Sequence, residues 1–228
     1  MTATEFFNGP ILLWSPPVVS MALCILAVLF YFGWLPFFAV RFSRHQKFYR
    51  ALAMIMIAFR VCYAGLLTVL QYLLWSGGAL SRVLLGSPLV LPDHVDVVPR
   101  WLAWIFQNSG GYFFYYAWAR FWLSAILAIG GAFMWCLFLR FLARHKERFF
   151  DEGEVMLGFL SALLVGWPRI TIFVPLLFFC VVFLSLVRRI VWGYRYTTLG
   201  APFLLSAFLT ILFGTTLLAL TGLSVLNV

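Results

Sequence analysis

The stretch RFLARHKERFFDEGEVMLGFLSALLVGW, residues 140–167, decides how this chain is organised. A basic turn runs into Asp151-Glu152-Gly153-Glu154 and then into a short apolar segment that breaks at Gly166-Trp167-Pro168. Four of the seven acids in the protein lie within residues 147–154. Because the rest of the chain has few carboxylates, a chemical centre, if there is one, is expected in this stretch.

The composition indicates a membrane protein. The chain of 228 residues is 64% hydrophobic and 10% charged, whereas soluble proteins are about half apolar and a quarter charged. Its net charge is +9, but the basic residues form short clusters beside apolar runs, where they suit anionic lipid headgroups. We therefore expect an all-α polytopic integral membrane protein whose partners are membrane lipids and other membrane protein subunits, and not nucleic acid.

The residues that usually hold metals or cofactors are scattered. The four cysteines fall in four different apolar runs without a CxxC pair, and the three histidines lie in loops far apart in sequence. There is no nucleotide-binding glycine motif and no helical histidine pair at metal or haem spacing. We expect no metal and no cofactor.

The apolar runs predict a single transmembrane domain, residues 1–228, with about six membrane segments. These cover residues 15–40, 51–75, 112–139, 154–167, 170–187 and 199–225. The fourth is shorter than the roughly 20 residues that a helix needs to cross a bilayer, so it is expected to be short or re-entrant. Whether residues 76–111 re-enter or cross the membrane is left open by the sequence.

The basic loops predict sidedness. Residues 41–50, 140–148 and 188–195 hold 11 of the 16 Lys and Arg. The positive-inside rule puts these loops on the cytoplasmic or matrix side of a bacterial or organellar inner membrane.

Two arginines, Arg60 and Arg120, lie inside predicted membrane segments. A guanidinium in the bilayer costs about 3 kcal/mol on insertion scales, so each should snorkel or find a partner. With proline-broken helices around Pro36 and Pro175, these arginines also fit a transporter of a small solute or ion.

A membrane aspartyl site would need two carboxylates that meet near the lipid boundary. The candidates are Glu154, or Asp151 beside it, paired with Asp93 or Asp96. The predicted topology separates these two groups, because it places residues 76–111 outside and Glu154 inside. The alternative is that Glu154 and its neighbours form an acidic helix N-terminus, favoured by the helix dipole and by nearby basic residues.

Four segments together resemble the type IV prepilin leader peptidases, which are polytopic aspartyl proteases of the GxGD type. They are GWLPFFAVRFSR at 33–44, LPDHVDVVPRWLAW at 91–104, EGEVMLGFLSALLVGWP at 152–168 and LGAPFLL at 199–205. The resemblance implies a bacterial inner-membrane fold in which a glycine-aspartate motif opens a short helix that ends in Gly-Trp.

The match departs from that family at its catalytic positions. The resemblance places the second catalytic aspartate at Glu154, the first motif glycine at Asp151 and the first catalytic aspartate at Leu85. Residues 41–50 occupy the place of the family's cysteine-rich zinc loop. The resemblance therefore implies a degenerate relative without peptidase activity.

We thus expect a non-catalytic polytopic subunit of a larger membrane assembly, either pilus or secretion machinery or an energy-transducing complex. The alternatives are a divergent aspartyl endopeptidase, with Glu154 and Asp93 or Asp96 as its acids, and a transporter.

Overall fold

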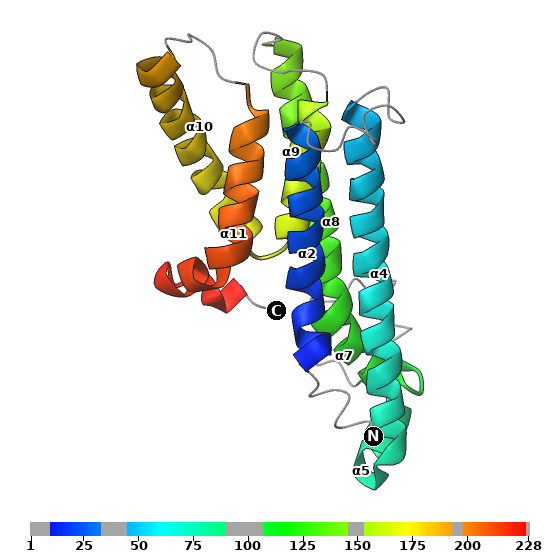
Figure 1. Cartoon of the computed structure of the whole chain (residues 1–228). Helices are drawn as coiled ribbons and strands as arrows, with labels where there is room; N and C mark the ends of the chain where they lie inside the picture. The colour runs from blue at the N-terminus through cyan, green and yellow to red at the C-terminus, as the bar shows by residue number, and fades with distance from the viewer. Residues whose placement is uncertain (1–9, 33–44, 90–106, 146–152, 193–197, 227–228) are drawn as a thin grey trace. The chain divides into compact units, whose positions relative to one another are not determined.

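The computed structural model describes residues 10–32, 45–89, 107–145, 153–192 and 198–226. All secondary structure in these ranges is helical, which confirms the predicted all-α class (Figure 1). In chain order the elements are α2 (Pro10–Tyr31), α4 (His45–Gly77), α5 (Ala79–Gly86), α7 (Gly111–Ala117), η1 (Trp118–Trp122), α8 (Leu123–His145), α9 (Glu154–Val165), α10 (Ile170–Trp192), α11 (Gly200–Leu220) and η3 (Leu223–Leu226).

Four helical stretches are long and apolar enough to cross a membrane, as an integral membrane protein requires. They are Gln46–Gly77, Gly111–His145, Ile170–Val191 and Gly200–Leu220. Two shorter apolar helices, Ser15–Tyr31 and Glu154–Val165, lie at the places of the first and fourth predicted segments. The predicted total of about six segments stays a prediction.

The chain divides into two compact units, each described here by itself. Unit 1 contains residues 61–124, which include the second half of α4 together with α5, α7 and η1. Unit 2 contains residues 15–60 and 125–227, which include most of α2, the first half of α4, most of α8, and α9 to α11.

Unit 1 is held together by aromatic side chains. Trp75 of α4 stacks on Tyr112 of α7 with ring centroids 6.1 Å apart, and meets Phe113 edge to face at 5.5 Å. The Trp122 indole N–H donates a hydrogen bond of 3.1 Å to the Thr68 hydroxyl. The aromatic run that opens the third predicted segment therefore packs on the neighbouring helix.

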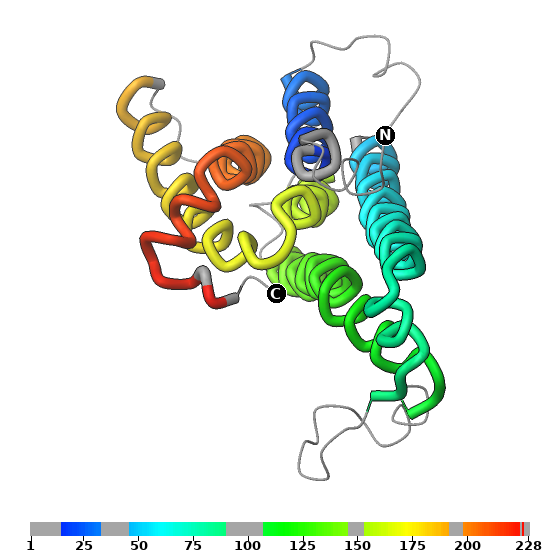
Figure 2. Tube along the Cα trace, turned by 90° about the horizontal axis from the view of Figure 1, so that it is seen from below, coloured from blue at the N-terminus to red at the C-terminus, as the bar shows by residue number. Residues whose placement is uncertain are grey.

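Unit 2 is built around α9, as the end-on view in Figure 2 shows, where α9 lies between α2, α8 and α11. At Gly158 an added Cβ would lie 3.0 Å from the Phe203 ring of α11 and would also collide with the Leu139 side chain of α8. Because both side chains are buried, the missing Cβ lets three helices meet at this level.

Two local features differ from what the sequence suggests. Helix α10 runs unbroken through Pro175, although a proline removes one backbone hydrogen bond from a helix. An added Cβ would have no atom of another segment within 4 Å at Gly130, and would make only an ordinary contact of 3.5 Å with Ile170 at Gly131. Adjacent glycines are typical of a close approach between helices, but the close approach lies at Gly158.

Candidate functional site

Helix α9 is too short to cross a bilayer, and it is largely buried inside unit 2. Its 12 residues span about 18 Å, against a hydrocarbon thickness of about 30 Å. Nine of them are buried, including the only acidic residue in the part of the chain that the structure describes. Both ends of α9 therefore meet other helices of unit 2, and a polar side chain singled out from the sequence lies at each end.

The first end is organised by Glu154. Gly153 takes a left-handed conformation with φ of 93°, which favours glycine, and starts the helix. Glu154 is the first helical residue, only 4% exposed, and its Oε1 accepts a hydrogen bond of 2.7 Å from the backbone N–H of Gly200. Since Gly200 is the first residue of α11, one carboxylate lies at the positive ends of two helices, where a negative charge is stabilised.

Two tyrosines lie near this carboxylate. The Tyr31 ring packs against Gly200, where an added Cβ would lie 2.8 Å from the ring Cζ and the hydroxyl. The Tyr31 hydroxyl is also 3.5 Å from the Thr198 hydroxyl. Tyr49, which is buried, is close enough to interact electrostatically with both Tyr31 and Glu154. Helices α2, α4, α9 and α11 thus meet in a partly buried polar cluster.

The second end of α9 is organised by Arg60 of α4. Its Nη2 donates a hydrogen bond of 2.7 Å to the carbonyl of Leu163, one of the last carbonyls of α9. Gly166 follows with φ of 69°, a conformation that favours glycine, and leaves room for the guanidinium against its Cα. Because the last four carbonyls of a helix have no partner within it, and its C-terminus carries partial negative charge, Arg60 caps α9.

The residues predicted from the sequence are only partly brought together. Glu154 and Arg60 lie at opposite ends of α9, and Arg120 is exposed on the π-helical turn η1 of unit 1. Asp93, Asp96 and Asp151 lie outside the described residues. The pairing of Glu154 with Asp93 or Asp96 therefore stays a prediction.

Sequence reasoning missed the residues that surround Glu154, namely Tyr31, Tyr49 and Gly200. In a chain with 9 Tyr and 26 Phe, one tyrosine carries no distinguishing signal. The available clue was the glycine that opens each helix, because Gly153 precedes α9 and Gly200 starts α11.

No group of three or more His, Cys, Asp or Glu that could hold a metal ion occurs in the described ranges. All four cysteines have free thiols. Chemically, the first end of α9 offers one buried carboxylate with two phenols near it, and the second end offers one partly buried guanidinium.

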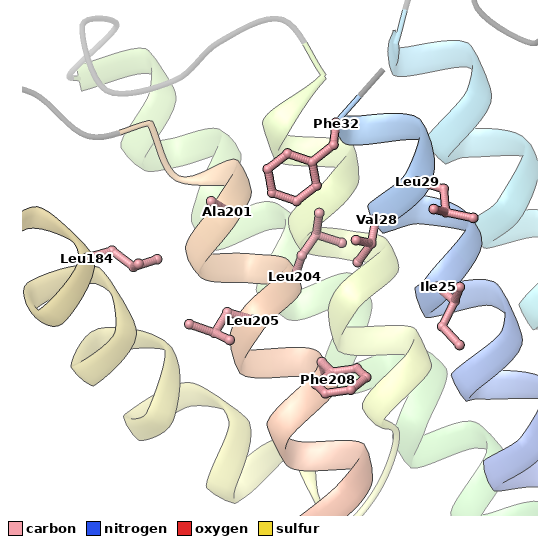
Figure 3. A pocket seen from close by; sticks show the side chains of 9 residues that line it. All are labelled: Ile25, Val28, Leu29, Phe32, Leu184, Ala201, Leu204, Leu205 and Phe208. Atoms are coloured by element: carbon pink, nitrogen blue, oxygen red, sulfur yellow. The ribbon is translucent and has the colours of Figure 1, made fainter. Parts of the chain in front are cut away.

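Unit 2 also carries an apolar groove of about 380 Å³. Figure 3 shows Phe32, the residue just after α2, reaching toward α11 above Val28 and Leu204, while Leu184 comes from α10. The lining is wholly aliphatic and aromatic, and it consists of Ile25, Val28, Leu29, Phe32, Leu184, Ala201, Leu204, Leu205 and Phe208.

Comparison of the chain with known protein families, with curated proteins and with solved structures finds no match.

Proposed function

We propose that this chain is a non-catalytic polytopic subunit of a larger membrane assembly, belonging to pilus or secretion machinery or to an energy-transducing complex. The observation that carries the proposal is the environment of Glu154. Its carboxylate is buried and accepts a backbone hydrogen bond from Gly200, so it ties α9 to α11. A catalytic carboxylate has to reach a substrate or a water molecule in a cleft. Glu154 supports the structure of unit 2 instead.

The proposed architecture has six membrane segments, formed by α2, α4, the continuous stretch 111–145, α9, α10 and α11. The basic loops lie on the cytoplasmic or matrix side of an inner membrane, and lipid covers most of the outer surface. Helix α10 supports this arrangement because its outer face carries a continuous apolar row that suits lipid or a helix of another subunit. The row consists of Phe178, Phe179, Val182, Phe183, Leu186, Ile190 and Val191.

A second candidate function is a divergent membrane aspartyl endopeptidase similar to the prepilin peptidases. The observation that favours it is the position of Glu154 at the start of a short buried helix that ends just before Gly166-Trp167, as the resemblance implies for a catalytic acid. Against it, the place of the first catalytic acid is taken by Leu85, an apolar residue of α5. Asp93 or Asp96 would then have to supply the second carboxylate.

A transporter is less well supported. It calls for a polar cavity lined by Arg60 or Arg120 near the middle of the bilayer. The Arg60 guanidinium instead donates a hydrogen bond to the Leu163 carbonyl of α9, and Arg120 is exposed on η1.

The first test determines the side of the membrane on which Asp93 lies. His94→Cys is made in a variant whose four native cysteines are replaced by serine, and it is treated with an impermeant thiol reagent in right-side-out and inverted vesicles. We expect labelling from the outer side only, which separates Asp93 from Glu154. Labelling from the cytoplasmic side would bring the acids together and favour the endopeptidase.

The second test examines assembly and catalysis directly. The chain is extracted from its native membranes in two mild detergents and run on native gels. We expect it to migrate in the same complex in both detergents, well above its own mass of 26.1 kDa. Purified chain in liposomes is also incubated with a prepilin substrate. Cleavage that disappears in Glu154→Gln would overturn the proposal in favour of the endopeptidase.

A further inference from the structure

The turn between α9 and α10 brings two arginines together. The Arg60 guanidinium lies against Gly166, where an added Cβ would be 2.8 Å from its Cζ and 2.9 Å from its Nη1. Arg169 follows three residues later, and its Cδ lies 3.1 Å from the position of a Cβ on Gly214 of α11. Both arginine side chains are partly buried and lie at this one turn. Two positive charges are therefore placed at the connection between α9 and α10.

Hydrogen-bond donors at this turn lack acceptors. Arg60 has five N–H donors, of which one reaches the Leu163 carbonyl. Its Nε–H is buried and has no partner among the described residues, and the same holds for the indole N–H of Trp167. The backbone N–H groups that open α10 are already used, since those of Ile170 and Thr171 donate within the turn. The donors without an acceptor thus belong to arginine and tryptophan side chains, which can donate hydrogen bonds but not accept them.

No carboxylate is available nearby in the part of the chain that the structure describes. Its single acid, Glu154, lies 12 positions before Gly166 on α9, which corresponds to about 18 Å along the helix. Two like charges repel strongly where the dielectric constant is low, and a buried charge normally pairs with an opposite one. An anion at the turn would offset positive charge there and would accept hydrogen bonds from the unpaired donors.

From this arrangement we propose that the α9–α10 turn binds a phosphate group, held by Arg60 and Arg169 with the Trp167 indole as a further donor. Tetrahedral oxyanions match the planar fork of arginine, which donates two parallel hydrogen bonds to two oxygens. The phosphate is either inorganic phosphate or the phosphodiester of an anionic lipid headgroup, since both offer at least two negatively charged oxygens to a guanidinium. This proposal does not depend on whether the chain is catalytic.

The test uses the full chain in an uncharged detergent and measures its melting temperature. Sodium phosphate is compared with sodium chloride at equal ionic strength, and detergent-soluble phosphatidylglycerol is compared with phosphatidylcholine. A ligand at about 100 times its Kd should raise the melting temperature by roughly 5–10 °C. The rise should vanish in Arg169→Gln and persist in Arg120→Gln, the matched control with an exposed arginine.

A rise with inorganic phosphate supports the proposal and identifies a free anion as a ligand, whereas a rise with phosphatidylglycerol alone supports it and identifies a lipid headgroup. The proposal is overturned if neither probe raises the melting temperature, or if Arg169→Gln responds as the wild type does. Should Arg169→Gln fail to fold, Arg169→Lys keeps the charge but loses the fork, and weaker binding is expected. Equilibrium dialysis of the wild type against radiolabelled phosphate and, separately, radiolabelled phosphatidylglycerol then gives the answer without a variant.

Discussion

The packing of α9 makes a sharp prediction at Gly158. In Gly158→Ala, the new methyl group would lie 3.0 and 3.1 Å from two carbons of the Phe203 ring, and it would also collide with the Leu139 side chain. Favourable carbon–carbon contacts lie at about 3.5–4.0 Å. Phe203 is 1% exposed and Leu139 is 2% exposed, so neither can move into free space. The substitution should therefore strain the contact between α8, α9 and α11.

The size of the effect is best measured against a matched substitution. Replacing glycine by alanine within a helix gains roughly 0.5–1 kcal/mol at either site, while overpacking a tight core costs roughly 1–3 kcal/mol. Gly130→Ala in α8 gives only the gain, because no other atom lies within 4 Å of the added Cβ. Comparing the two variants cancels the gain, so only the overpacking cost remains. At about 2–4 °C for each kcal/mol in a chain of this length, Gly158→Ala should melt roughly 2–12 °C below Gly130→Ala.

The cysteines provide the assay. Cys24, Cys136 and Cys180 are buried in unit 2, where both glycines lie, so a thiol-reactive fluorogenic dye reports the unfolding of that unit. Cys62 is exposed and is replaced by serine to remove the background. Equal melting temperatures for Gly158→Ala and Gly130→Ala would refute the tight three-helix contact. A melting temperature of Gly158→Ala above that of the wild type would refute it as well.

Three further results are expected. In the same thermal assay, Glu154→Ala should lower the free energy of unfolding by about 1–3 kcal/mol, because the buried N–H of Gly200 loses its acceptor. Glu154→Gln keeps an acceptor and should lower it less. Equal losses of stability in the two variants would contradict the hydrogen bond. Trp122→Phe should lower the free energy of unfolding by about 0.5–1.5 kcal/mol, because the hydrogen bond to Thr68 is lost. Adding Thr68→Val to this variant should lower it little further, which a double-mutant cycle would measure. Under native conditions a membrane-permeant thiol reagent should modify Cys62 before the other three thiols, because Cys62 lies on the surface of its helix and the others are buried. Equally fast modification of a second thiol, counted by mass spectrometry, would contradict the burial in unit 2.

Much of the helical framework follows from local sequence. Long apolar runs predict helices because the backbone in lipid has to satisfy its own hydrogen bonds. The break at Gly166-Trp167-Pro168 was predicted, and α9 does end at Val165 while α10 begins at Ile170. These features depend on residues close together in the chain, where glycine and proline leave clear signals.

The partners of the polar residues could not be predicted in the same way. The sequence says that Arg60 should snorkel or find a partner, but the Leu163 carbonyl that it reaches is 103 positions away. The bond between Glu154 and Gly200 joins residues 46 positions apart. A backbone carbonyl or N–H is present at every position, so the sequence carries no sign of which one will face a given side chain. Only the packing of the helices decides this.

The shortness of α9 explains why this protein places an acid and an arginine at these two positions. A helix that spans the bilayer leaves its unpaired terminal N–H and C=O groups at the headgroups, where water satisfies them. Both ends of α9 lie within unit 2, so other parts of the protein have to supply the hydrogen-bond partners that water supplies at the headgroups. Glu154 places a negative charge at the positive end of α9 and accepts a terminal N–H of α11, and Arg60 donates to a terminal carbonyl of α9. An ionisable residue within a membrane segment usually suggests function. Here the same residues satisfy the ends of a buried helix, and the donors that Arg60 leaves unpaired are what point to a bound ligand.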